Sequence, residues 1–263
     1  MDPDVRSKTP GKCPRCGMAL EAGIQQPLDY RLVFRKEPAN VPAGRPVELQ
    51  FELIDPRTKK RATHFEVVHE KLFHLFLVSA DLEYFVHDHP TLGSDGIFRF
   101  RTTLPQAGIY RLLADCYPTG GTPQLLPHYL TTAGYDKSIA ESTAHPPADI
   151  SPKNSANMAV SLRMEPAEPV PGKKTMLFFT LDPGEGVEPY LGAWGHMLAA
   201  SNDLMDAIHE HPIYVNDKPA DGKPEIQFNV FFPREATYRI WVQFQRKGVV
   251  NTAAFTIPVK ALQ

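Results

Sequence analysis

A twenty-residue segment occurs twice in this 263-residue chain, and this internal repeat limits the possible folds more than any other feature. Segments KLFHLFLVSADLEYFVHDHP (71–90) and AWGHMLAASNDLMDAIHEHP (193–212) align without a gap at an offset of 122 residues. Seven of their twenty positions are identical, whereas ordinary residue usage would give about one. The identical pairs are His74/His196, Ser79/Ser201, Asp81/Asp203, Leu82/Leu204, His87/His209, His89/His211 and Pro90/Pro212. The chain is therefore duplicated, with three shared histidines per copy.

The similarity continues on both sides of this segment. Val41-Pro42-Ala43-Gly44 precedes the first copy as Val170-Pro171-Gly172 precedes the second. Downstream, Phe98-Arg99-Phe100 corresponds to Ile226-Gln227-Phe228 at an offset of 128, which indicates a short loop insertion around residues 215–224.

Each copy consists of short apolar or alternating runs separated by Pro, Gly and Asp, a pattern typical of an antiparallel β-sandwich of about 100 residues. The 26 prolines disfavour long helices. We therefore expect an all-β chain with two tandem Ig-like antiparallel β-sandwich domains and a short cysteine-bearing N-terminal segment. The expected division is a head at 1–26, a first sandwich at 27–134, an extended linker at 135–156 and a second sandwich at 157–263.

The three shared histidines fall on a predicted hairpin. Residues 73–79 and 85–90 have the composition of strands, and residues 79–83 contain the Ser and Asp typical of a turn. Folding about Leu82 places His74 opposite about position 90. His87 and His89 are two residues apart and share one sheet face. Three imidazoles should therefore converge at the open end of this hairpin, and His196, His209 and His211 should repeat the arrangement.

Imidazole nitrogen suits zinc, copper, nickel and iron, and three histidines with a position left for water form an open metal site. The alternative is that these histidines are ordinary strand residues bonded to backbone carbonyls. Their duplication favours the metal site. His69 and Glu70 are weaker candidates, because Leu191 and Gly192 occupy their positions in the second copy. Cys116, whose counterpart is Phe244, should be a buried and inert thiol.

The head contains TPGKCPRCGMAL at residues 9–20, in which Cys13 and Cys16 have the C-x2-C spacing and Met18 follows. These sulfur ligands favour Cu(I) or zinc. A structural knuckle or a redox pair are the alternatives.

The head resembles the short heavy-metal-binding domain found at the ends of copper-efflux ATPases and efflux-pump adaptors. The resemblance covers about twenty residues, and its Pro-Gly-Lys-Cys-Pro-x-Cys-Gly-Met core is specific. It implies metal binding by Cys13, Cys16 and Met18. The family usually has Cys-Pro-Met-His-Pro upstream, whereas this chain begins at the Met and has Asp2 in place of the His, so the head is expected to be truncated. The remainder resembles uncharacterised bacterial proteins with His…His-x-His-Pro sandwich repeats.

The charge balance argues against nucleic acid or an anionic membrane as the main partner, because 28 Lys and Arg face 30 Asp and Glu, with no long basic run. No stretch approaches the ~18 apolar residues of a transmembrane segment. The first residues lack the apolar core of a secretory signal, so the chain is either cytosolic or numbered after a removed leader. The resemblance implies a periplasmic or cell-envelope location.

These features predict a non-enzymatic protein that binds copper, or alternatively zinc, for sequestration or handover, with one three-histidine site per sandwich. A metal efflux or delivery protein is the expected partner. Two alternatives remain. One is an adhesion or adaptor module with a structural metal. The other is a mononuclear metal-dependent enzyme, a hydrolase or copper oxidase, for which only Glu70 or Asp88 could supply an acid or base.

Overall fold

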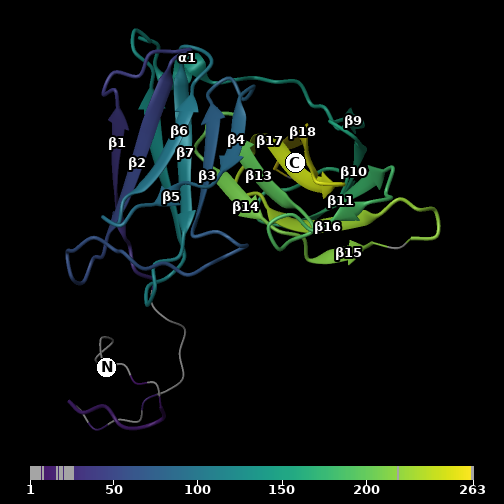
Figure 1. The fold of residues 1–263 in the computed structure, drawn as a ribbon. Helices are drawn as coiled ribbons and strands as arrows, with labels where there is room; N and C mark the ends of the chain where they lie inside the picture. The colour runs from purple at the N-terminus through teal and green to yellow at the C-terminus, as the bar shows by residue number, and fades with distance from the viewer. Residues whose placement is uncertain are drawn as a thin grey trace.

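The computed structural model describes residues 7, 9–15, 17, 20, 27–217 and 219–261. It confirms the all-β class, with two antiparallel β-sandwiches side by side and each built from two sheets (Figure 1). Among the described residues, no helix has the length and apolar character needed to cross a membrane.

The first sandwich has two four-stranded sheets. One has the order β1 (Arg31–Glu37), β2 (Pro46–Ile54), β6 (Phe98–Thr103) and β5 (Thr91–Leu92). The other has the order β4 (Phe85–Asp88), β3 (Phe73–Ser79), β7 (Ile109–Cys116) and β8 (Gln124–Thr131).

The second sandwich repeats this plan. One sheet has the order β15 (Tyr214–Asn216), β16 (Glu225–Phe231), β11 (Lys174–Asp182), β10 (Ala159–Glu165) and β9 (Lys153–Asn154). The other has β12 (Val187–Glu188), β17 (Ala236–Arg246), β13 (His196–Ser201) and β14 (Ala207–Glu210), and β18 (Val249–Val259) pairs with β17. Strands β3, β4 and β7 thus correspond to β13, β14 and β17.

Alternating apolar side chains fill the core of each sandwich. In β2, Leu49, Phe51 and Leu53 are fully buried at every second position, and in β11 Leu177, Phe179 and Leu181 are fully buried in the same way. This period of two directs one face of each strand into the core. Cys116 also packs in the first core, where burial raises the pKa of its thiol, as expected for an inert cysteine.

The histidine-bearing sheets of the two sandwiches pack against each other. Every residue of β3 is buried, because its inner face packs in the first sandwich while its outer face meets the second. This shared apolar layer includes Phe76 from β3, Leu198 from β13 and Trp241 from β17. The rings of Phe85 and Trp241 stack across this layer, with their centroids 5.0 Å apart. The two sandwiches therefore share a third core in addition to their own.

The segment between the sandwiches differs from the expected extended linker. Residues Ile139–Ser142 form helix α1, which begins at a capping box between Ser138 and Glu141. The Asn202 side chain donates to Ala144 O at 3.0 Å and holds the segment against the second sandwich. Strand β9 pairs with β10, so the second sandwich begins at residue 153, before the expected boundary of 157.

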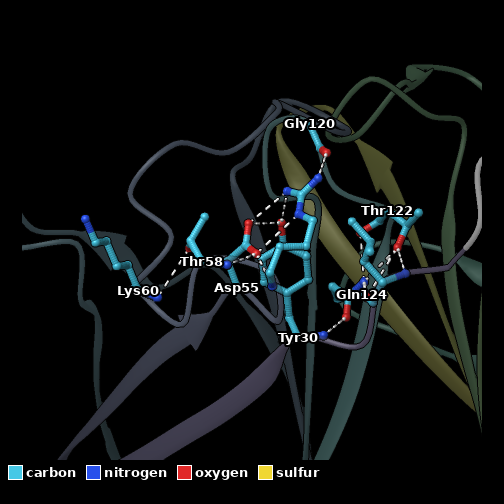
Figure 2. A network of polar contacts seen from close by, with 9 residues as sticks. Tyr30, Asp55, Thr58, Lys60, Gly120, Thr122 and Gln124 are labelled. Atoms are coloured by element: carbon cyan, nitrogen blue, oxygen red, sulfur yellow. Dashed lines mark hydrogen bonds and ion pairs between the residues drawn. The ribbon is translucent and has the colours of Figure 1, made fainter. Parts of the chain in front are cut away.

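A polar network fixes the chain where it enters the first sandwich (Figure 2). Gln124 Nε2 donates to Leu28 O at 2.7 Å, and Gln124 Oε1 accepts from Tyr30 N at 3.1 Å. The Tyr30 hydroxyl donates to Asp55, whose pKa is held well below its usual range chiefly by the hydrogen-bonded Arg57 guanidinium. Leu28 and Tyr30, where the chain enters the sandwich, are therefore bonded to Gln124 at the start of β8.

Truncation in the shared layer should destabilise the protein although it leaves both sandwich cores intact. Leu198 is fully buried in this layer, so Leu198→Ala should lower the free energy of unfolding by about 2–5 kcal/mol, measured by urea denaturation. The control is Val67→Ala at a position that is 66% exposed, where the change should stay within about 0.5 kcal/mol. Equal effects of the two substitutions would show that the sandwiches do not pack as described.

Candidate metal centre

The residues that are identical in the two copies lie in two places, the turn of a hairpin and the open end of the same hairpin, where the histidines are. Ser79 Oγ donates to the Asp81 carboxylate and accepts from Tyr84 N, and Ser201 with Asp203 forms the same turn in the second copy. Leu82 and Leu204 adopt positive φ angles of 63° and 56° and bury their side chains. The shared Ser, Asp and Leu therefore fix the length of the hairpin, which sets the register of the histidines.

Strand pairing brings the histidines of each hairpin to one face. In the first copy Phe76 pairs with His87 and Leu75 with Asp88, so this register puts His74 opposite His89. The expected pairing of His74 with position 90 is thus corrected by one residue. In the second copy Leu198 pairs with His209, which likewise puts His196 opposite His211.

The first triad consists of His74, His87 and His89, with one ligand atom from each within 4.8 Å of the others. His74 Nδ1 lies 3.1 Å from His87 Nε2 and 3.2 Å from His89 Nε2. The other nitrogen of His74 bonds to Val68 O at 3.0 Å.

The second triad consists of His196, His209 and His211, and one ligand atom from each again lies within 4.8 Å of the others. His211 Nε2 lies 3.1 Å from His196 Nδ1, and His196 Nε2 bonds to Tyr190 O at 2.9 Å. His209 Nε2 is buried and has no hydrogen-bond partner among the described residues.

Sequence analysis missed two residues that orient the triads from the opposite sandwich. His87 Nδ1 bonds to Gln243 Oε1 at 2.8 Å, and His209 Nδ1 bonds to Asp115 Oδ2 at 2.6 Å. Asp115 and Gln243 occupy equivalent positions of β7 and β17, opposite His74 and His196 in the strand pairing. The available signal was a polar residue at equivalent positions of the two copies, inside largely buried strands.

These contacts determine which nitrogens carry protons. Val68 O and Gln243 Oε1 can only accept, so His74 Nε2 and His87 Nδ1 donate to them. A neutral imidazole has one N–H, which leaves lone pairs on His74 Nδ1 and His87 Nε2. These two acceptors face each other at 3.1 Å. Nitrogens bound at about 2.0–2.1 Å in a tetrahedral site lie about 3.3 Å apart, so this donor set fits a metal ion.

The two triads adjoin each other across the interface between the sandwiches. The ring centroid of His87 lies 5.4 Å from that of His196, and the centroid of His74 lies 5.9 Å from that of His209. Centroids within the first triad are 4.9–5.4 Å apart. Each sandwich thus supplies one triad, as expected, and the two triads lie next to each other in a cluster of six imidazoles.

His69 adds a seventh ring to this cluster. Its ring stacks on that of His211 at 3.7 Å and lies 5.5 Å from that of His196. His69 and Glu70 have positive φ angles of 47° and 64°, a backbone conformation that residues other than glycine rarely adopt. The second copy has Leu191 and Gly192 in the equivalent turn. His69 thus reaches from the first sandwich to the triad of the second.

Burial favours the neutral form of six of these imidazoles. Desolvation lowers the pKa of His87 and His211 to about 2, of His196 to about 3 and of His89 to about 4, and it also lowers the pKa of His74 and His69. His74 and His196 are only 3% and 1% exposed. Neutral imidazole is the form that binds metal ions.

The candidate ligands of the head are only partly described. Cys13 is buried, and Gly17 N donates to Cys13 O at 2.8 Å. Cys16 and Met18 lie outside the described residues.

The metal-free protein should lose stability between pH 7 and pH 5. Unfolded histidines take up protons near a pKa of about 6.5, whereas the buried ones stay neutral until much lower pH. The unfolded chain then binds more protons, so the free energy of unfolding falls as the pH falls. Urea denaturation with chelator present measures this slope, and His89→Gln/His211→Gln should flatten it. A constant stability over this range would contradict the buried, neutral state of the histidines.

Several solved structures are similar in architecture. The adhesin FdeC of Escherichia coli is 15% identical, with 93% of this chain and 68% of FdeC covered and a TM-score of 0.30. The adhesin InvE of Yersinia pseudotuberculosis is 11% identical, with coverage of 87% and 59% and a TM-score of 0.27. A putative membrane anchored protein of Corynebacterium diphtheriae is 10% identical, with coverage of 90% and 61% and a TM-score of 0.27. Likeness at this level carries no argument about function.

Family models match nearly the whole chain. A heavy metal binding domain matches residues 1–22, which confirms the family of the head and, with the two histidine triads, supports metal binding. No curated protein matches the sequence. A domain of unknown function, DUF8832, matches twice, at residues 26–134 and 153–261. The chain therefore belongs to the DUF8832 family, as a tandem duplicate that follows a heavy metal binding domain.

Proposed function

We propose that this protein binds transition metal ions at two adjacent three-histidine sites, one supplied by each sandwich. The observation that carries the proposal is the contact between His74 Nδ1 and His87 Nε2, two lone-pair acceptors at 3.1 Å whose protons are held elsewhere by Val68 O and Gln243. Such a pair repels in a dry interface unless a cation lies between the nitrogens. His209 Nε2, buried without a partner among the described residues, supports the same role for the second triad.

Copper is our first candidate for the bound metal, and zinc is the second. Three imidazole nitrogens per site suit both ions. The heavy metal binding domain on the same chain supports copper, because its Cys13-Pro14-Arg15-Cys16 motif offers the sulfur ligands that Cu(I) prefers.

Sequestration is the role that the burial of the triads supports best. An ion held beside His74 and His196 is shielded from water by both sandwiches, and its release would require their separation or movement of the half-buried His89 and His211. A delivery or efflux partner that receives the ion would have to act at this more open end.

We further propose that the role is not catalytic. The Asp115 carboxylate bonds to the triad histidine His209. Because it orients this ring, it does not serve as a free acid or base. Glu70, the acid or base suggested by the sequence, lies instead beside Gly192, 3.7 Å from the position a Cβ would take there.

Metal titration of the full chain should give two bound ions per molecule once the head is inactivated by Cys13→Ser/Cys16→Ser. In this background His74→Ala/His87→Ala/His89→Ala should remove one ion, measured by elemental analysis after dialysis against copper or zinc. The exposed His145→Ala is the control and should leave the stoichiometry unchanged. Each occupied site should stabilise the folded state by about 2.7 kcal/mol at a metal concentration of 100 times its Kd. Unchanged stoichiometry in the triple variant would refute the proposal.

A further inference from the structure

We propose that the two triads fill in sequence as one coupled pair, and that Asp115 makes the triad of His196, His209 and His211 the first to fill. This inference rests on the proposed function and assigns Asp115 and Gln243 as the positioning residues that set the order of loading. Asp115 belongs to neither triad, and Gln243 Oε1 bonds to His87 Nδ1, the nitrogen that does not face His74.

Each positioning residue belongs to one sandwich and bonds to a histidine of the other. Asp115 lies beside His74 in the sheet of the first sandwich, yet its carboxylate bonds to His209 of the second. Gln243 lies beside His196 in the second sandwich, yet its amide bonds to His87 of the first. The two triads are thus matched in geometry, and they differ in the group that accepts the Nδ1 proton.

That difference is one of charge. Both acceptors fix the same imidazole tautomer and leave Nε2 for the ion. Only the carboxylate is charged, and its bond to His209 is shorter, at 2.6 Å against 2.8 Å for Gln243 and His87. A carboxylate behind a ligating imidazole makes the ligand more basic and offsets the positive charge of the ion. The second triad should therefore bind a cation more tightly than the first.

The proximity of the triads couples the two binding steps. The rings of His87 and His196 are 5.4 Å apart, and those of His87 and His209 are 6.0 Å apart. Two cations held by these rings repel each other strongly, because the apolar layer around Phe76 and Leu198 keeps the local dielectric low. The first ion bound should lower the affinity for the second, which separates the two steps.

The position of His69 adds to the same asymmetry. It covers His211 of the second triad with a ring stacked at 3.7 Å, whereas the counterpart of His69 in the other half is Leu191. The second triad therefore has both the additional carboxylate and the additional imidazole.

The experiment is a Zn²⁺ titration of the full chain carrying Cys13→Ser/Cys16→Ser, with calorimetry for the two affinities and ¹⁵N side-chain NMR to identify the histidines that respond at each step. The first equivalent should shift the resonances of His196, His209 and His211. Asp115→Asn should weaken the first step about 10–100-fold, the range for loss of a residue that orients a metal ligand. Gln243→Glu, which adds a carboxylate behind His87, should tighten binding at the first triad. The double variant Asp115→Asn/Gln243→Glu should reverse the order in which the two triads fill.

The outcomes separate this inference from the function it rests on. Two ions bound, with an order and affinities that Asp115→Asn and Gln243→Glu leave unchanged, would overturn the role of Asp115 and leave metal binding intact. The absence of shifts in all six histidines at saturating Zn²⁺ would overturn both. If Asp115→Asn fails to fold, Gln243→Glu decides alone, because the inference requires stronger binding at His74, His87 and His89.

Discussion

The burial of the outer faces of β3 and β13 against each other determines the rest of the structure. Each strand already packs one face in its own sandwich, so contact between the second faces places histidines where water cannot solvate them. A buried polar group must find a partner within the protein. Val68 O and Tyr190 O provide partners for His74 and His196, and Gln243 and Asp115 reach across the interface to His87 and His209. His74 Nδ1 then faces His87 Nε2 and His89 Nε2, and His196 Nδ1 faces His211 Nε2.

Much of the fold could be predicted from the duplicated segment. The period of two in strands such as β2, with Leu49, Phe51 and Leu53 inward, identifies sandwiches without a structure. The Ser-x-Asp-Leu turn fixes the hairpin, and the two-residue spacing of His87 and His89 puts both rings on one face. The convergence of three histidines per copy follows from local rules alone. The hairpin is centred between Asp81 and Leu82, whereas the expectation centred it on Leu82, so His74 lies opposite His89 instead of about position 90.

The association of the two sandwiches could not be predicted in the same way. Phe76 and Leu198 lie in strands with apolar residues on both faces, where the sequence cannot tell a residue of the sandwich core from one that packs on the neighbouring sandwich. Asp115 and Gln243 act on histidines of the other half, 94 and 156 residues away, so no local spacing points to them. His69 looked like a weak candidate because Leu191 replaces it in the second copy, yet it contacts the second triad.

The covalent fusion of the two copies has a consequence for how such a centre can evolve. In an assembly of two identical chains, any substitution would alter both halves at once. Here the equivalents Asp115 and Gln243, and His69 and Leu191, have diverged independently while the ligand histidines have not. The duplication has thereby allowed the surroundings of two originally identical histidine triads to diverge, while the sandwiches that carry them keep the same plan.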